Sequence, residues 1–129
     1  MNSQVKFNLS ILGIFVFSLG IRFWNLSQFN TLVFDEVYYA KYGNEYLIGK
    51  EFFQSHPPLS QYLIAMSIWI GSHFSADPET INNLTGSLRS TLSYRWLNAF
   101  TGSFIPLIIG GIAYQLTQRK TVFLITTFL

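Results

Sequence analysis

The sequence has no cysteine, two histidines and few charged residues, which make up 11% of the chain. The lack of cysteine excludes disulfides and thiolate metal sites. The two histidines lie far apart in the sequence, which argues against a histidine-based metal site. The net charge is only +2, and no basic cluster is interleaved with aromatic residues. The composition therefore gives no indication of a nucleic acid partner.

Hydrophobic residues, in contrast, make up half of the chain, and aromatic residues account for 18%. The apolar residues are concentrated in long blocks rather than spread in amphipathic periods. Such blocks are typical of helices in contact with lipid. We therefore predict an all-α, multi-pass integral membrane protein whose first partner is the lipid bilayer.

The first apolar block, 7–24, is about eighteen residues long, just enough to cross the hydrocarbon layer. Its one charged side chain, Arg22, lies near the far end, where it can reach the interface beside Trp24. Because Lys6 precedes the block, a signal peptide is the alternative. The bulky run Ile21-Arg22-Phe23-Trp24 does not resemble a cleavage site, so we expect an uncleaved span.

A second block, 94–116, is long enough for another span, and three of its glycines, Gly102, Gly110 and Gly111, would allow close helix contacts. After a basic turn, 121–129 begin another apolar segment. We expect this segment to be the start of a third span that continues beyond the sequence.

Between the two spans, the mixed stretch 25–93 holds most of the acidic residues. It predicts a helix over 35–48, with Gly49 as its stop, and a second, apolar helix over 59–74. The polar segment 75–93 indicates a surface loop.

The topology depends on whether the helix 59–74 crosses the membrane. If it crosses, Lys6 and the Arg119-Lys120 turn lie on opposite sides. If it lies along the interface, both lie on one side, as the positive-inside rule favours. The short length of this helix favours the second arrangement. We therefore expect 25–93 to lie on the outer (periplasmic, extracellular or lumenal) face.

The adjacent acids Asp35 and Glu36 stand at the start of a predicted helix, soon after the first span. An acid there serves as a helix cap in many proteins. Paired carboxylates also suit general-base or metal chemistry. The pair alone leaves both interpretations open.

Four sequence elements, taken together, resemble the protein O-mannosyltransferase family. In chain order they are 21–24 (IRFW), 34–42 (FDEVYYAKY), 52–59 (FFQSHPPL), and 94–102 (YRWLNAFTG) followed by 105–107 (IPL). In that family an aromatic residue precedes Asp-Glu, a His-Pro-Pro-Leu element follows about twenty residues later, and the second span contains an arginine. The resemblance covers almost the whole chain but only the amino-terminal part of a family member.

The resemblance implies a lipid-carrier-dependent glycosyltransferase of the GT-C class. Such an enzyme moves mannose, or a related sugar, from a polyprenyl-phosphate donor such as dolichyl phosphate to serine or threonine hydroxyls of a protein acceptor, with inversion. By the same resemblance Asp35 is the general base, and Glu36 orients the site through Arg22 or Arg95. Either arginine could also stabilise the lipid phosphate. His56 either positions the acceptor or contacts the phosphate, or it packs against the prolines as a structural residue.

The sequence leaves the cofactor undetermined, because paired acids permit a divalent metal ion but do not require one. It also leaves the host membrane open: a bacterial plasma membrane or the endoplasmic reticulum of a eukaryote. Asn83-Leu84-Thr85 forms a glycan acceptor pattern on the predicted outer face, although such tripeptides often arise by chance.

Two other functional classes remain as alternatives. One is a short membrane protein that binds or assembles with partners and catalyses nothing. The other, a small transporter or channel, has little support, because the apolar segments carry charge only near their ends, whereas substrate pathways usually carry it inside.

Overall fold

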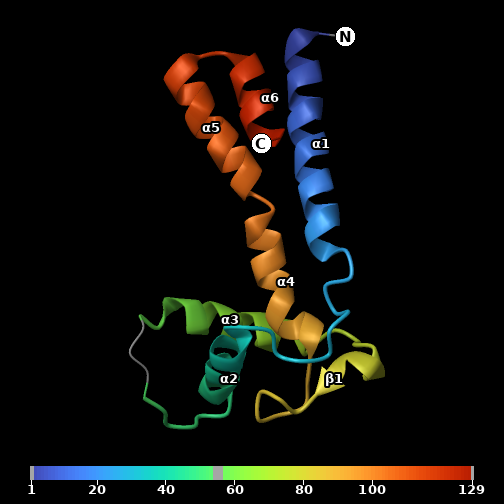
Figure 1. The fold of residues 1–129 in the computed structure, drawn as a ribbon, viewed down its shortest axis with the longest axis vertical. Coiled ribbons are helices and arrows are strands. Elements are labelled where there is room, and N and C mark those ends of the chain that lie inside the picture. Colours follow the sequence, from blue (N-terminus) through green and yellow to red (C-terminus); the bar gives the residue numbers. More distant parts are fainter. Residues whose placement is uncertain (1, 54–56, 129) are drawn as a thin grey trace. The chain divides into compact units, whose positions relative to one another are not determined.

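The computed structural model describes residues 2–53 and 57–128. Figure 1 shows how its elements are arranged within the chain. In chain order they are α1 (Ser3–Phe23), α2 (Glu36–Leu47), α3 (Leu59–Gly71), the 3₁₀ turn η1 (Pro78–Thr80), β1 (Ile81–Asn82), β2 (Arg89–Ser90), α4 (Thr91–Gly102), α5 (Ile105–Thr117) and α6 (Lys120–Phe128). The prediction of a helical membrane protein is confirmed in that the structure is mostly helical. Two of its helical stretches, Ser3–Phe23 and Thr91–Thr117, are long and apolar enough to cross a membrane.

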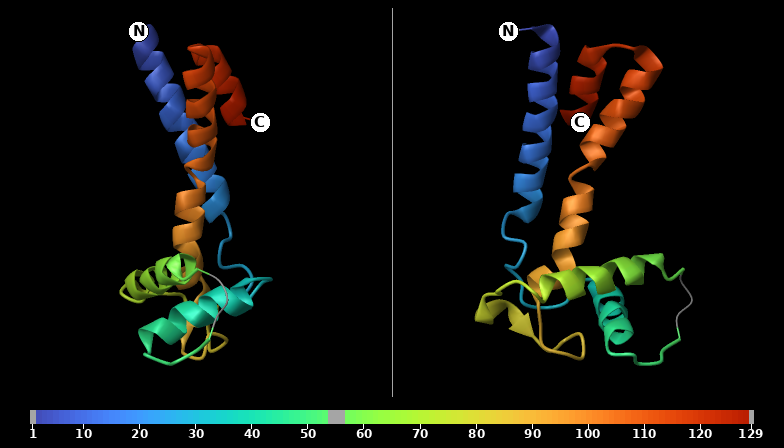
Figure 2. Two further views of the ribbon diagram at one scale, coloured as in Figure 1. Left: turned by 90° about the vertical axis from the view of Figure 1, so that its left-hand side faces the viewer. Right: turned by 180° about the vertical axis from the view of Figure 1, so that it is seen from behind.

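The chain forms two compact units. One, called here the helical unit, comprises Met1–Trp24 and Asn98–Leu129; the other, the loop unit, comprises Asn25–Leu97. Within the helical unit, α6 folds back on α5, and both lie beside α1 (Figures 1 and 2).

The second candidate span is interrupted after Gly102, where α4 ends, and resumes at Ile105 as α5. Pro106 lies in the first turn of α5. A proline ring clashes with the carbonyl four residues earlier and cannot donate to it. Pro106 therefore explains why the helix breaks at Ser103-Phe104, which the apolar pattern alone did not reveal.

The hairpin of α5 and α6 depends on one glycine that the sequence suggested for close packing. A Cβ atom added at Gly110 would overlap the Thr127 side chain and come within 3.1 Å of Phe123. At Gly111, nothing lies within 4 Å of the same position. Of these two neighbours, only Gly110 is required by the contact between the helices.

The turn between α5 and α6 lies beside the start of α1. The Lys120 ammonium donates to Gln4 Oε1 over 2.6 Å and lies 5.1 Å from the centre of the Phe7 ring. The basic turn and the amino-terminal end of α1 are therefore at the same end of the helical unit.

In the loop unit, α2 packs across α3 at a position without a side chain (Figure 2). A Cβ at Gly43 would come within 2.8 Å of Ile64 and 3.1 Å of the Ala65 nitrogen. Beside this crossing lies a small apolar core of Ala40, Ile64, Ile68 and Tyr94, with Leu32 and Tyr39 packed against it. As expected, α2 stops at a glycine: Gly49 has a φ of 65°.

The buried face of α3 is partly polar, and its exposed face is apolar. Gln61 and Ser67 are completely buried, and Ser67 donates to the Ser93 carbonyl over 2.8 Å. The exposed side chains of the helix are mostly large and hydrophobic: Leu59, Tyr62, Leu63, Met66 and Trp69. A helix in water would present the opposite pattern.

Most of the segment 75–93 is exposed or partly exposed, as expected of a surface loop, but it contains a short hairpin that the sequence did not predict. β1 and β2 pair in antiparallel register, Ile81 with Ser90 and Asn82 with Arg89. Several of the polar residues are buried, including Thr85, Ser90, Thr91 and Ser93. Polar composition did not reveal this, because the hydroxyls of Thr85, Ser90 and Ser93 bond to protein groups instead of water.

One asparagine connects α2 to this hairpin. Asn44 is completely buried. Its amide donates to the Thr85 carbonyl over 3.1 Å and to Ser87 Oγ over 3.0 Å, and its carbonyl oxygen accepts from Arg89 Nε over 2.9 Å. The segment that the sequence suggested was a loop is therefore fixed to the helix that begins at the acid pair.

Candidate functional site

The two neighbouring acids occupy different environments at the start of α2. Asp35 is the residue before the first turn, as predicted, but its carboxylate makes no capping hydrogen bond and is exposed. Glu36 is half-buried, and its Oε2 accepts from the Val33 amide over 3.0 Å. No side chain caps the start of α2 in the way that we considered for Asp35; the Glu36 carboxylate binds back to the preceding turn instead.

The turn that carries the acids contains an unusual backbone conformation. Phe34 has a φ of 51°, in the left-handed region, and its side chain is 86% exposed. Non-glycine residues held in this region cost of the order of 1–3 kcal/mol and occur where neighbouring groups enforce them. Here the Val33 amide bonds to the Glu36 carboxylate, and the Val33 carbonyl accepts from the Glu36 amide over 3.1 Å.

Arg95 holds Glu36 in place. The guanidinium makes a bidentate ion pair, with Nε donating to Glu36 Oε1 and Nη2 to Oε2, both over 2.7 Å. The side chain of Arg95 is only 9% exposed and that of Glu36 28%. Planar two-point pairing of this kind fixes orientation as well as charge. Of the two arginines expected as partners for Glu36, the structure pairs it with Arg95.

The remaining donors of Arg95 bind the segment that leads to the acids. Nη1 donates to the carbonyls of Leu26 and Phe29, over 3.1 and 2.9 Å, and Nη2 donates to that of Thr31 over 2.8 Å. With the two bonds to Glu36, all five N–H groups of the guanidinium are used. A phosphate could bind this arginine only by displacing one of these oxygens.

Among the described residues, the Asp35 carboxylate has neither a hydrogen bond nor an ion pair, whereas that of Glu36 is fully engaged. The site thus contains one acid that positions the turn and one that is exposed to an incoming molecule. A carboxylate with an unoccupied lone pair can accept a proton from a hydroxyl that approaches within hydrogen-bond distance.

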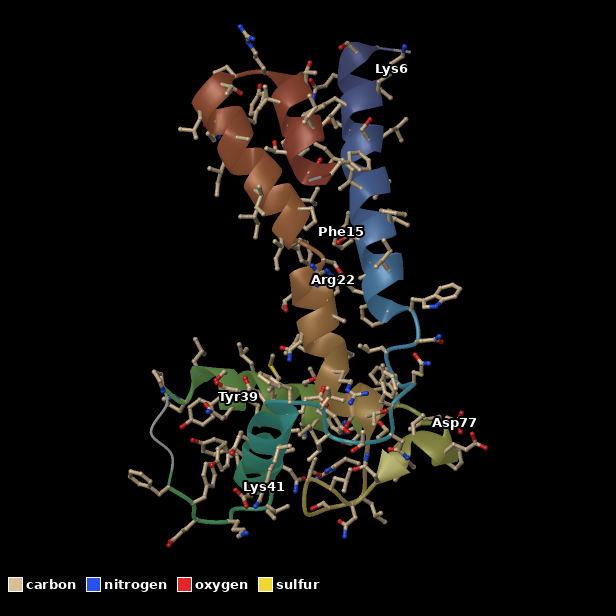
Figure 3. The ribbon with its side chains drawn as sticks, viewed as in Figure 1. Lys6, Phe15, Arg22, Tyr39, Lys41 and Asp77 are labelled. Carbon is tan, nitrogen blue, oxygen red and sulfur yellow. The ribbon has the colours of Figure 1, made fainter. Side chains whose placement is uncertain are left out.

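Arg22 belongs to the helical unit. It lies in the last turn of α1, and its guanidinium occupies the space left open by the missing side chain of Gly102, where a Cβ would come within 2.9 Å of Nη1 (Figure 3). It also lines a cavity of about 400 Å³ that is otherwise mostly apolar, together with Ile14, Phe17, Ser18, Ile21, Pro106, Thr127 and Phe128. A cation at the edge of an apolar cavity suits an anionic head attached to an apolar chain.

His56 lies outside the described residues, so the structure does not test the role expected for it. Among the residues that the structure describes, no group of three or more histidine, aspartate or glutamate side chains is arranged to hold a metal ion.

The sequence did not identify Thr31, Leu26 and Phe29 as parts of the site, because they act through backbone carbonyls. It also missed Asn44, whose buried side chain bonds α2 to the hairpin of β1 and β2. An asparagine in the interior of a helix is unfavourable by propensity. That is the one signal that could have pointed to a buried bonding role for Asn44.

Comparison with known proteins identifies the family. Residues 12–129 match the family model described as dolichyl-phosphate-mannose-protein mannosyltransferase. The chain therefore belongs to this family of glycosyltransferases.

Individual relatives agree with this. The chain is 46% identical to dolichyl-phosphate-mannose–protein mannosyltransferase 4 of Schizosaccharomyces pombe over 61 residues, 47% of this chain and 8% of the relative. It is 30% identical to mannosyltransferase 1 of Saccharomyces cerevisiae over 105 residues, 81% of this chain and 13% of the relative. It is 31% identical to mannosyltransferase 1 of Candida albicans over 117 residues, which are 84% of this chain and 12% of the relative. The chain thus spans about a tenth of the length of these relatives. No solved structure matches it significantly.

Proposed function

We propose that this chain supplies the general base of a protein O-mannosyltransferase, and that Asp35 is that base. The donor would be a polyprenyl-phosphate-linked mannose, such as dolichyl phosphate mannose, and the acceptor a serine or threonine of a protein. Family membership supports this reaction class. The observation that carries the assignment is the contrast between the engaged carboxylate of Glu36 and the exposed carboxylate of Asp35.

In the proposed reaction, the acceptor hydroxyl oxygen attacks the anomeric carbon of mannose. A new carbon–oxygen bond forms there as the bond to the lipid phosphate breaks, and the phosphate leaves with the electron pair. Asp35 accepts the hydroxyl proton during this step. Attack from the face opposite the phosphate inverts the anomeric centre. General-base catalysis of this kind contributes a factor of about 10² to 10⁴ to the rate.

Arg95 and Glu36 act in this proposal as positioning residues. Their ion pair and the three carbonyl bonds hold the left-handed turn at Phe34 and therefore the direction of the Asp35 side chain. Arg22, beside its apolar cavity in the helical unit, is the arginine that we propose for the lipid phosphate. Its guanidinium has no hydrogen-bond partner among the described residues.

The proposed location of the reaction is the outer or lumenal face, in a bacterial plasma membrane or, for a eukaryotic host, the endoplasmic reticulum. The contact between Lys120 and Gln4 supports this, because it brings both basic ends of the apolar segments together. By the positive-inside rule that end is cytoplasmic. We propose that 25–93 form the outer catalytic loop, with α3 lying along the interface and its apolar face toward lipid.

The test is a transfer assay on membranes in which the chain is expressed from its whole reading frame. The assay uses labelled dolichyl phosphate mannose and a serine- and threonine-rich peptide. Asp35→Asn should lower transfer by about 10² to 10⁴-fold. The matched control is Asp77→Asn, because Asp77 is an exposed acid of the same unit whose turn an asparagine caps equally well (Figure 3). Equal transfer by the wild type and Asp35→Asn would refute the assignment, and so would a wild type that transfers nothing.

A further inference from the structure

The short hairpin between β1 and β2 carries the tripeptide Asn83-Leu84-Thr85 at its tip. This tripeptide satisfies the pattern Asn-x-Ser/Thr of N-linked glycan acceptors. Asn83 is exposed, and among the described residues no hydrogen bond engages its side-chain amide. Only its backbone carbonyl is used, accepting from the Gly86 amide over 3.1 Å. A substituent on the amide nitrogen would therefore extend into solvent without breaking a described contact.

Thr85 has the opposite environment. It is 1% exposed, and its hydroxyl donates to the Ser87 carbonyl over 3.1 Å. Its own carbonyl accepts from the buried amide of Asn44. An enzyme that must contact the threonine hydroxyl cannot reach it in the folded hairpin. The acceptor pattern is accessible only before the hairpin packs against α2.

We propose that Asn83 carries an N-linked glycan, attached while the chain is still being made and before the hairpin folds. In that step the Asn83 amide nitrogen forms a bond to the anomeric carbon of an oligosaccharide carried on a lipid diphosphate. The bond from that carbon to the diphosphate breaks, the lipid diphosphate leaves with the electron pair, and the amide proton passes to a base of the host transferase. The inference rests on the proposed outer placement of 25–93.

The folded structure accommodates the modified residue. Neighbours of Asn83 in the hairpin keep their bonds: Asn82 caps the Leu84 amide over 3.0 Å and bonds to Asn30 over 2.7 Å. Gly86 takes the left-handed conformation that closes the turn, with a φ of 92°. None of these contacts uses the position at which the glycan would be attached.

The experiment is synthesis of the chain in the presence of microsomes that carry lipid-linked oligosaccharide, followed by glycosidase treatment and electrophoresis. All variants carry Ser27→Ala, which removes the other tripeptide of this pattern in 25–93, Asn25-Leu26-Ser27. In that background, the chain with Asn83 and Thr85 intact and the chain with Thr85→Ser should show the added mass of one glycan, which the glycosidase removes. Asn83→Gln and Thr85→Val should show none. Chain synthesised first, allowed to fold in detergent and only then exposed to the transferase should remain unmodified. Efficient modification of the folded chain would contradict the proposal that the glycan is attached before the hairpin folds.

A second variant separates this inference from the outer placement itself. Gly49→Asn with Glu51→Thr, in a background that carries Asn83→Gln and Ser27→Ala, creates an acceptor tripeptide at two exposed positions after α2. Asparagine tolerates the φ of 65° found at position 49. If this variant is glycosylated and the chain with Ser27→Ala alone is not, the segment is lumenal and the Asn83 inference is wrong. If neither is glycosylated, the outer placement fails, and the inference fails with it.

Discussion

The helical unit and the loop unit are stabilised in different ways. Described side chains of the helical unit make few polar contacts between helices, such as that from Lys120 to Gln4, and much of its apolar surface is exposed, for example Phe17 and Ile108. In the loop unit, long-range hydrogen bonds of Asn44, Arg95 and Ser67 hold separate segments together. Lipid can cover the exposed apolar surface of the helical unit. The hydrogen bonds of the loop unit, in contrast, hold its segments in one particular geometry. The proposed general base, Asp35, lies in the loop unit, whose geometry these bonds specify.

The largest loss of stability is expected from Arg95→Ala. Removing one partner of a largely buried ion pair costs about 3–5 kcal/mol, because the remaining charge is left without compensation. Arg95→Lys should recover only a part, since an ammonium group cannot reproduce the two-point contact with Glu36. Thermal unfolding in detergent measures both. The control is Arg119→Ala, an exposed arginine of the helical unit; if it destabilises the protein equally, the comparison of the two units fails.

A smaller but clear loss is expected from Asn44→Ala. The substitution leaves the Thr85 carbonyl and the Arg89 guanidinium without their partner, and each buried group left unpaired costs about 1–3 kcal/mol. Limited proteolysis should then cleave the 81–90 hairpin faster. Lys41→Ala, at an exposed position of the same helix, serves as the control. Unchanged proteolysis of the hairpin in Asn44→Ala would contradict the role of this residue.

The stability of the helical unit should depend on side-chain volume where its helices touch, rather than on polar groups. Gly110→Ala forces a methyl group into Thr127 and Phe123, and overpacking of this kind costs about 1–3 kcal/mol. Gly111→Ala meets nothing within 4 Å and should stabilise α5 by about 0.5–1 kcal/mol through helix propensity. Opposite shifts in unfolding temperature for two adjacent glycines are the expected result. Equal shifts would mean that α5 and α6 do not pack closely at Gly110.

The smallest effect concerns the turn before the acids. Phe34→Gly removes the cost of holding a residue with a side chain in the left-handed region, but it also makes the unfolded chain more flexible. Because the two effects oppose each other, we expect the free energy of unfolding to change by no more than about 1 kcal/mol. Phe34→Val should be more destabilising, because a β-branched residue tolerates φ of 51° least. Chemical denaturation distinguishes the two variants. If valine is tolerated as well as glycine, the turn is not held in this conformation.

The sequence predicted the helices, apart from the break at Ser103-Phe104, and also predicted the family. Long apolar blocks predict spans because lipid requires about twenty apolar residues per helix. Four sequence elements taken together, one of them around Asp35 and Glu36, indicated the family, which the comparisons confirmed. Gly49 marked the end of α2, because a positive φ is favourable mainly for glycine.

The different roles of Asp35 and Glu36 could not be derived from their positions in the sequence. They depend on Arg95, fifty-nine residues away from Glu36, and on three backbone carbonyls that have no sequence signature. The burial of Thr85 was missed for a similar reason, since its partners are backbone groups and the side chain of Asn44. Polar composition predicts exposure only where such partners are absent.

The most direct test compares Asp35→Asn with Glu36→Gln in both mannosyl transfer and thermal unfolding. Asp35→Asn should reduce transfer by about 10² to 10⁴-fold without changing the unfolding temperature, because its carboxylate is exposed and caps nothing. Glu36→Gln should lower transfer and the unfolding temperature together, since it weakens the ion pair with Arg95. Transfer retained in Asp35→Asn, or equal destabilisation by the two variants, would contradict the division between a chemical acid and a positioning acid.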